Sequence, residues 1–318
     1  MAVDPKSILS TYSQLPSVSP VMKKLILLIF LGAAFVAAPT NAGLFSFNSG
    51  TPDGLLATAS RPEDLGFGKI EIESADDFIV PIQGVNLTSA TFTGLLPTGF
   101  SLGNVGQVVV EIYRVFPLDS DVGRTSGPPT FSTPKVPTRV NSPSDVAFDS
   151  RNSGAGGGLQ LQSISVLNPN FTAANSILNG INPVPNQLTL GEGSVTGQEV
   201  QFNVNFTHPF SLPAGHYFFV PQVDLPGATD NFFWLSVPRP IVPPGTPFPP
   251  GFTDLQAWIR NANLDPDWLR EGADIVGGTT FNEAFSVNGV LPDSGSTALL
   301  FASATGALVY LRRRFRPI

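Results

Sequence analysis

Cysteine is absent from the 318-residue chain, and His208 and His216 are its only histidines. The lack of cysteine excludes a disulfide framework and every thiolate zinc site, and two histidines cannot build a three-histidine zinc site. Charged residues are also scarce, at 13%, whereas hydrophobic residues make up 42%. Because this apolar content suffices for a core, the low charge does not indicate disorder, and the core alone must stabilise the fold.

The few charges are mostly acidic. The formal net charge is −7, and several of the basic residues lie at the two ends, before position 43 and after position 311, so the middle of the chain is more acidic still. Phosphate binding requires clustered lysine or arginine, so this balance argues against a nucleic-acid partner. Solubility is the simpler explanation of the acidic charge.

Proline and glycine, at 31 residues each, interrupt the chain too often for long helices and favour short strands joined by turns. Period-2 apolar runs predict about eight strands, at 69–73, 78–81, 86–93, 107–116, 159–166, 198–207, 216–221 and 232–237. This spacing predicts a mainly β body, 43–290, built as an antiparallel β-sandwich or jelly roll. Long Pro/Gly-rich loops are expected at 117–157 and 238–251, and one or two short helices at 253–261 and 263–270.

Residues 22–42 contain the three regions of a secretion signal. Lys23 and Lys24 form a positive start, an apolar run covers 25–38, and Ala42 ends a small-residue cleavage site. A retained anchor or a buried helix is the alternative, but the run is short for a membrane span. We expect export and cleavage by signal peptidase, and we interpret residues 1–21 as an artefact of the assigned gene start, since a polar extension has no place before a signal peptide.

The C-terminal segment 291–318 combines three features in order. A polar motif, Pro292-Asp293-Ser294-Gly295-Ser296-Thr297, precedes an apolar stretch at about 297–311, and Arg312, Arg313 and Arg314 follow it. A helix over this stretch covers about 22 Å, which is short of a full hydrocarbon core, although arginine can snorkel to the interface. The positive-inside rule keeps the arginines in the cytoplasm and places the body outside. An ordinary tail anchor is the alternative.

This order of features resembles the sorting tail of the PEP-CTERM class in its VPDSG form, with Leu291 in place of the usual valine. The resemblance implies a transient stay in the inner membrane, recognition by an exosortase-type processing enzyme, and release to the cell surface. It also implies an association with extracellular polysaccharide, which is common in that class.

Acidic residues supply weak candidates for a ligand site. Asp119 and Asp121 alternate in the long loop and could share a calcium ion, but the EF-hand pattern is absent, and an ion pair with Arg124 is the alternative. No other cofactor is indicated. Asp76 and Asp77 are adjacent, so an extended chain points them to opposite sides. Solvated charge at a strand edge is the simplest interpretation of these two residues.

Tryptophan and histidine supply the remaining candidates. Trp258 and Trp268 lie in polar, helix-like segments and could form a sugar-stacking platform, whereas Trp234 belongs to an apolar run and is expected in the core. His208 and His216 are expected to face each other across a hairpin, where they could bind a metal weakly.

Three functions follow from these patterns. The leading hypothesis is a non-enzymatic, exported envelope or matrix protein associated with exopolysaccharide. The second is a carbohydrate-binding module with Trp258 and Trp268 as anchors. The third is a secreted glycan-active hydrolase, whose two carboxyl groups at a defined separation a sequence cannot reveal. No catalytic residue is predicted, because no nucleophile motif accompanies the histidines.

Overall fold

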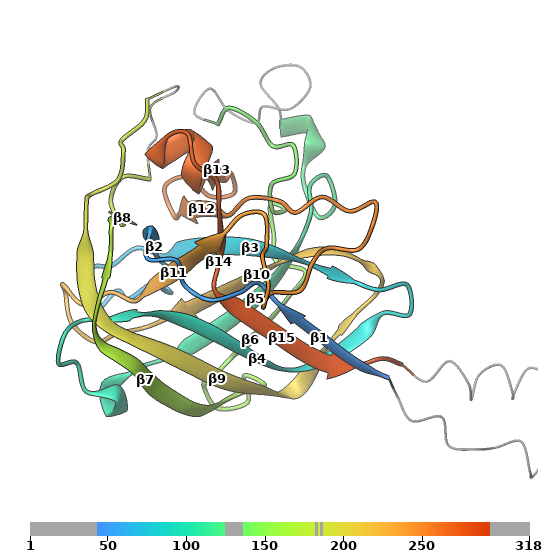
Figure 1. The fold of residues 1–318 in the computed structure, drawn as a ribbon, viewed down its shortest axis with the longest axis horizontal. Coiled ribbons are helices and arrows are strands. Elements are labelled where there is room, and N and C mark those ends of the chain that lie inside the picture. Colours follow the sequence, from blue (N-terminus) through green and yellow to red (C-terminus); the bar gives the residue numbers. More distant parts are fainter. Residues whose placement is uncertain (1–42, 125–135, 182–183, 185–186, 293–318) are drawn as a thin grey trace, which may run out of the picture. The chain divides into compact units, whose positions relative to one another are not determined.

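The computed structural model describes residues 43–124, 136–181, 184 and 187–292, which belong to one compact unit. These residues are mainly β and form two sheets (Figure 1). The mainly β class predicted from the alternating, turn-rich sequence is thereby confirmed. The nine-stranded sheet is called sheet I, and the six-stranded one is called sheet II.

Sheet I is organised around β4, which pairs with three strands. Its members are β1 (Leu44–Asn48), β2 (Leu56–Ala59), β4 (Val85–Leu96), β7 (Leu159–Ala173), β8 (Asn175–Ile177), β9 (Val195–Leu212), β11 (Phe233–Pro238), β14 (Phe281–Glu283) and β15 (Phe285–Val290). β9 runs along one side of β4, and β15 and the start of β11 pair with the other. β7 lies beyond β9, β1 beyond β15, and β2 and then β8 beyond β11. Only β2 and β8 are parallel.

Sheet II follows the order β13-β12-β3-β10-β5-β6, with every pair antiparallel. Its members are β3 (Ile72–Val80), β5 (Val108–Arg114), β6 (Asp149–Asn152), β10 (Gly215–Val223), β12 (Trp258–Asn261) and β13 (Leu269–Arg270). Three short helices complete the described elements: η2 (Leu102–Asn104), η3 (Val122–Arg124) and the π-helix η4 (Glu271–Val276).

Phenylalanine builds the core between the two sheets. Phe219 of sheet II stacks on Phe285 of sheet I, with ring centroids 5.0 Å apart and planes 2° apart, and Phe92 of sheet I lies 6.4 Å from Phe219. Trp234 is fully buried in the same cluster, as its apolar run predicts. Burying each such ring contributes about 1.5–3 kcal/mol, so these rings, rather than disulfides, hold the sheets together.

A second apolar cluster covers the outer face of sheet II. Phe218 and Val220 flank the inward-facing Phe219 in β10, so they point away from sheet I. Trp258 and Trp268 join this cluster. The chain around Ser144 lies over it, because Trp268 Nε1 donates a hydrogen bond of 3.1 Å to Ser144 O.

The strand predictions hold better than the helix predictions. Every predicted run overlaps a strand, but 69–73 and 78–81 belong to one strand, β3. The helices predicted at 253–261 and 263–270 are wrong, since β12 and β13 occupy these segments and η4 begins only at Glu271. Backbone pairing of β12 with β3 and β13 outweighs the helical spacing of the apolar residues.

The predicted terminal segments fall outside the described part of the chain. They are the extension 1–21, the signal peptide 22–42 and the membrane span at 297–311. Within the described ranges, no helix has the length and apolar character needed to cross a membrane.

Candidate functional site

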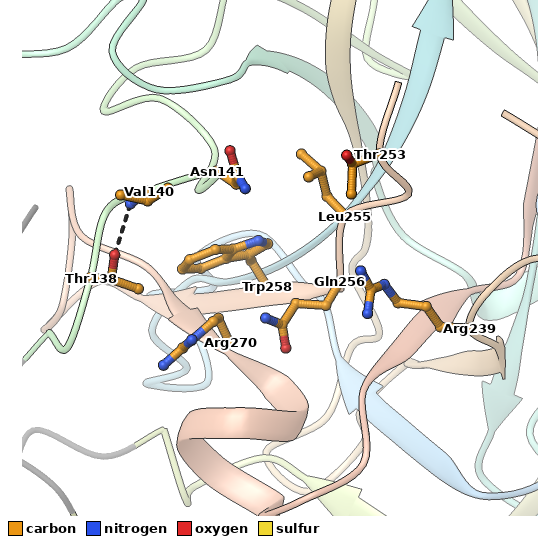
Figure 2. Close-up of a pocket in the computed structure, with 9 residues that line it drawn as sticks. All are labelled: Thr138, Val140, Asn141, Arg239, Thr253, Leu255, Gln256, Trp258 and Arg270. Atoms are coloured by element: carbon orange, nitrogen blue, oxygen red, sulfur yellow. Dashed lines mark hydrogen bonds between the residues drawn. The ribbon is translucent and has the colours of Figure 1, made fainter. Parts of the chain in front are cut away.

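A pocket of about 260 Å³ opens on the outer side of sheet II. Its lining residues come from the 138–141 segment, the Pro-rich loop, β12 with the residues before it, and β13: Thr138, Val140, Asn141, Arg239, Thr253, Leu255, Gln256, Trp258 and Arg270 (Figure 2). Pockets for drug-sized ligands have volumes of about 300–1,000 Å³. This pocket is therefore sized for one small unit of a ligand.

Strand pairing places the polar side chains of the pocket. Trp258 lies opposite Arg270 of β13, and residues opposite each other on paired strands project from the same face of the sheet. Gln256 precedes Trp258 by two residues, so an extended chain turns both to the same side. Figure 2 shows Gln256 between Arg270 and Arg239, with Trp258 beside it.

Two polar atoms in the pocket wall have no hydrogen-bond partner. They are Trp258 Nε1 and Gln256 Oε1, and both atoms are buried. Leaving a buried donor or acceptor without a partner costs about 1–3 kcal/mol, so either atom would gain from a ligand that completes it. The indole N–H is a donor and the amide oxygen an acceptor, and a hydroxyl group can serve both.

The two arginines of the pocket are held in place and compensated in charge. Arg270 forms a bidentate pair with Asp274, with distances of 2.9 and 2.6 Å. Arg239 donates from Nε to Asp254 O at 3.2 Å and from Nη1 to Thr280 Oγ1 at 3.0 Å. Each guanidinium has five N–H groups, so donors remain on both side chains, which are about a quarter exposed. The pocket therefore offers many donors without a strong net positive charge.

A layer of acidic groups lies behind the 253–258 wall. Asp77 Oδ2 accepts the Leu255 amide at 3.2 Å and contacts His216 Nε2, and Asp254 Oδ1 accepts Asn282 Nδ2 at 3.0 Å. Burial raises the pKa of Asp254, and burial together with the Asp254 charge raises the pKa of Asp77 well above its ordinary range. Burial lowers the pKa of His216 to about 4, so its imidazole is neutral at pH 7.

Two further carboxyl groups, Glu271 and Glu283, form a pair that is fully buried. Asp76 Oδ2 accepts the Glu283 amide at 2.8 Å, and Thr58 Oγ1 donates to Glu283 Oε1 at 3.2 Å. Burial raises the pKa of Glu271 to about 8, and burial with repulsion from Glu271 raises the pKa of Glu283 well above its ordinary range. Burial and the repulsion between two neighbouring carboxylates both favour a state in which the pair retains a proton.

The interpretation of Asp76 and Asp77 as solvated strand-edge charge is wrong. β3 lies inside sheet II between β12 and β10, and each of the two residues is 1% exposed. They do project to opposite sides, as adjacent strand residues must: Asp76 contacts the β14 backbone, and Asp77 contacts Leu255 and His216.

Trp268 belongs to a polar network that is already satisfied. Its Nε1 donates to Ser144 O, and the Arg260 guanidinium lies 4.4 Å from its ring centroid. Arg260 contacts Glu73 through Nε and donates from Nη2 to Tyr113 Oη at 2.8 Å. Tyr113 Oη in turn donates to Glu73 Oε1 at 2.7 Å. These groups leave no polar atom of Trp268 for a ligand.

The expected sugar-stacking platform of Trp258 and Trp268 is not formed. The residues are 1% and 2% exposed, and stacking requires an open ring face. Trp258 alone borders the pocket. Sequence inspection did not single out Gln256, Arg239 or Arg270, because only the pairing of β12 with β13 and the path of the Pro-rich loop bring them to Trp258.

Asp119 and Asp121 have other partners than expected. Asp119 forms a bidentate ion pair with Arg114, not with Arg124, and Asp121 Oδ1 accepts the Gly123 amide at 2.9 Å. In the described ranges, no group of three or more acidic or histidine residues is arranged to hold a metal ion. A calcium ion at Asp119 and Asp121 stays a prediction.

His208 and His216 do not form the expected pair across a hairpin. His208 lies in β9 of sheet I and His216 in β10 of sheet II, so the turn between these strands connects the two sheets. His216 contacts Asp77, whereas the His208 backbone bonds to Gly158 and Arg151.

The two ends of the described chain lie side by side. The Leu291 amide donates to Gly43 O at 2.8 Å, and β1 pairs with β15 from Leu44 and Val290 onward (Figure 1). Pro292 is exposed. The other residues of the predicted sorting signal lie outside the described residues: Asp293, Ser294, Gly295, Ser296, Thr297, Arg312, Arg313 and Arg314. The predicted signal-peptidase site and the start of the predicted tail are thus neighbours.

Comparisons with known proteins give no relative. No protein-family model matches the chain, no curated protein matches it, and no solved structure matches it. A proposal for its function therefore rests on the residues of the chain itself.

Proposed function

We propose that this chain is an exported, non-enzymatic cell-envelope protein that binds a saccharide unit of an extracellular polysaccharide in the pocket beside Trp258. Its body is an antiparallel, jelly-roll-like sandwich, and its C-terminal segment is an exosortase-type sorting signal. The observation that carries the proposal is the pair of unpartnered buried atoms, Trp258 Nε1 and Gln256 Oε1, in a pocket lined by further donors.

The chemistry of the pocket favours a ligand rich in hydroxyl groups. A sugar hydroxyl both donates and accepts, so the hydroxyl groups of a sugar offer an acceptor to the indole N–H and a donor to the amide oxygen. Arg239 and Arg270 add donors while Asp254 and Asp274 compensate their charge. A free anion would gain little binding free energy from arginines whose charge is already compensated. A neutral sugar would gain more by forming hydrogen bonds with Trp258 Nε1 and Gln256 Oε1.

The geometry of the two ends supports export. Gly43 and Leu291 are hydrogen-bonded neighbours, so a membrane-bound leader and a membrane-bound tail could both leave the body at the same edge. A folded body with distant ends would have to span between two attachment points. This arrangement suits a protein that is processed at both ends while its body lies outside the membrane.

The position of the acidic groups supports a non-enzymatic site. Glycoside cleavage needs two carboxyl groups on either side of the scissile bond. Asp77 is 1% exposed and its Oδ2 accepts the Leu255 amide, whereas Asp254 accepts from the Ile241 amide and from Asn282 Nδ2. Among the described residues, the lining of the pocket holds donors, hydroxyl groups and amide oxygens but no carboxylate.

Binding can be tested by affinity electrophoresis in gels that contain neutral or uronic-acid polysaccharides. W258F lacks the indole N–H and Q256A lacks the amide oxygen. From the retardation we expect both variants to show a Kd at least about tenfold larger than that of the wild type, since losing a hydrogen bond of about 1.4 kcal/mol raises Kd about tenfold. Q83A is the matched control, because Gln83 is exposed in a turn outside the pocket. Circular dichroism checks the fold of each variant. Equal retardation of all four proteins, or none by any polysaccharide, would contradict the proposal.

A further inference from the structure

The strand β7 forms a long free edge of sheet I. Within the described ranges it pairs with β9 and with no other strand, although it extends from Leu159 to Ala173. At its two ends the chain bonds to other segments, since Gly158 bridges to Asn152 and Ala174 N donates to Gly54 O. Between these ends, no strand of the described residues pairs with the second edge of β7, which presents backbone N–H and C=O groups.

This edge carries no charged side chain along its whole length. Proteins blunt exposed edges with charged side chains, especially lysine, with proline, with β-bulges, or with a covering segment. The chain has no Asp, Glu, Lys or Arg between Arg151 and Glu192, although 13% of its residues are charged. Pro169 is the only proline of β7 and lies near its C-terminal end. Neither charge nor proline therefore protects the run from Leu159 to Leu167, and the register shifts at Leu161/Ser163 and Val166/Asn168 are the only irregularities of its pairing with β9.

The exposed side chains of β7 are compatible with a strand–strand interface. Gln160, Gln162 and Ser165 are exposed and polar, whereas Val166 and Leu167 are 42% and 52% exposed. Figure 1 shows β7 beside β9 at the border of the fold. Uncharged polar and aliphatic side chains of this kind pair favourably across antiparallel strands.

We propose that two copies of this chain pair their β7 strands antiparallel, so that their two nine-stranded sheets become one continuous sheet. Antiparallel pairing of identical strands is self-complementary about a two-fold axis, and it gives each edge the backbone partners that it lacks. Charge selects this edge over others: the chain is acidic overall, at −7, so two copies repel each other except where they present an uncharged strip. The pairing does not depend on the ligand of the pocket.

Single-cysteine spin labelling tests this geometry directly, because the natural chain contains no cysteine. Q160C, Q162C and S165C are each labelled in the full-length chain in detergent, and the distance between labels of two copies is measured by pulsed EPR. When a regular strand pairs with its copy about a two-fold axis, moving the label by one residue changes the separation along the strands by about 7 Å, twice the rise of about 3.4 Å. The register shift between Leu161 and Ser163 makes the step smaller at Gln162. We expect the three measured distances to fit a single position of the two-fold axis along β7. Association through any other segment gives distances outside the progression and overturns the proposal, as does the absence of dipolar coupling.

A charge substitution provides the second measurement. S165K places a like charge from each copy into the paired edge, and we expect at least about tenfold weaker dimerisation by sedimentation velocity. T207K is the matched control, because Thr207 is also an exposed β-strand residue but lies in β9, which β7 and β4 flank. Equal dimerisation of S165K and T207K, or a wild-type chain that stays monomeric across the concentration series, overturns the proposal.

Discussion

The buried pair Glu271–Glu283 should make the stability of the fold fall as the pH rises. The pKa of Glu271 is about 8 in the folded protein, against an ordinary value of 4.5. Between these two values the folded state keeps a proton that the unfolded state has lost, so the free energy of unfolding decreases with pH. One retained proton corresponds to about 1.4 kcal/mol for each pH unit, or up to about 4 kcal/mol between pH 5 and pH 8.

The substitution Glu271→Gln removes this titration. The amide keeps the shape of the side chain and can donate to Glu283, so it replaces a titrating group by a permanent donor. It also removes the repulsion that raises the pKa of Glu283. We therefore expect E271Q to gain stability relative to the wild type as the pH rises, by about 1.4 kcal/mol for each unit between pH 5 and pH 8.

Urea unfolding followed by tryptophan fluorescence measures this difference, since all three tryptophans are buried. The slope of the unfolding free energy against pH is compared among wild type, E271Q and E63Q, and Glu63 is an exposed residue of the same type. Slopes, rather than absolute stabilities, carry the comparison, so a constant packing cost of the substitution does not matter. Parallel slopes for wild type and E271Q would refute the retained proton.

Three further predictions concern other parts of the molecule. Arg260→Met should destabilise the fold by about 3–5 kcal/mol in urea unfolding, because it leaves the buried Glu73 without its cation. Adding the substitution Glu73→Gln should recover part of this loss. No recovery in the double variant would show that the ion pair is not the cause. Gly94→Ala should cost about 1–3 kcal/mol by thermal unfolding, since the added methyl group would lie 2.3 Å from Phe232 Cε2 and 2.4 Å from Phe233 O. Gly99→Ala is the control. Its methyl group would meet no neighbour within 4 Å among the described residues, although the φ of Gly99 is positive, so it should cost only about 1 kcal/mol or less. Replacing Arg312, Arg313 and Arg314 by alanine should disturb sorting, as measured by the mass and membrane fractionation of the mature protein, and the same mass and fractionation as the wild type would contradict the sorting signal.

The local patterns of the sequence were sufficient for the β class and for most strands. Period-2 runs such as 198–207 place alternate side chains in the core, and this is a property of the strand itself that neighbouring residues reveal. The absence of cysteine likewise left the core as the source of stability, and the Phe219–Phe285 stack between the sheets is the result. Short strands such as β12 and β14 escaped prediction, because pairing with distant strands, not local periodicity, decides their conformation.

The candidate site, by contrast, depends on contacts between residues that are far apart in the sequence. Asp76 and Asp77 look like surface charge in the sequence, yet β12 and β10 enclose them from both sides, and the resulting loss of solvation raises their pKa values. Trp258 and Trp268 look alike in the sequence, but Ser144 satisfies only the second, which leaves the first as the unpartnered donor beside the pocket. The sequence by itself determined the strand-forming segments and the uncharged run that became the free edge β7. The tertiary structure alone decided which polar groups are buried, which of them lack a partner, and therefore where a ligand can bind.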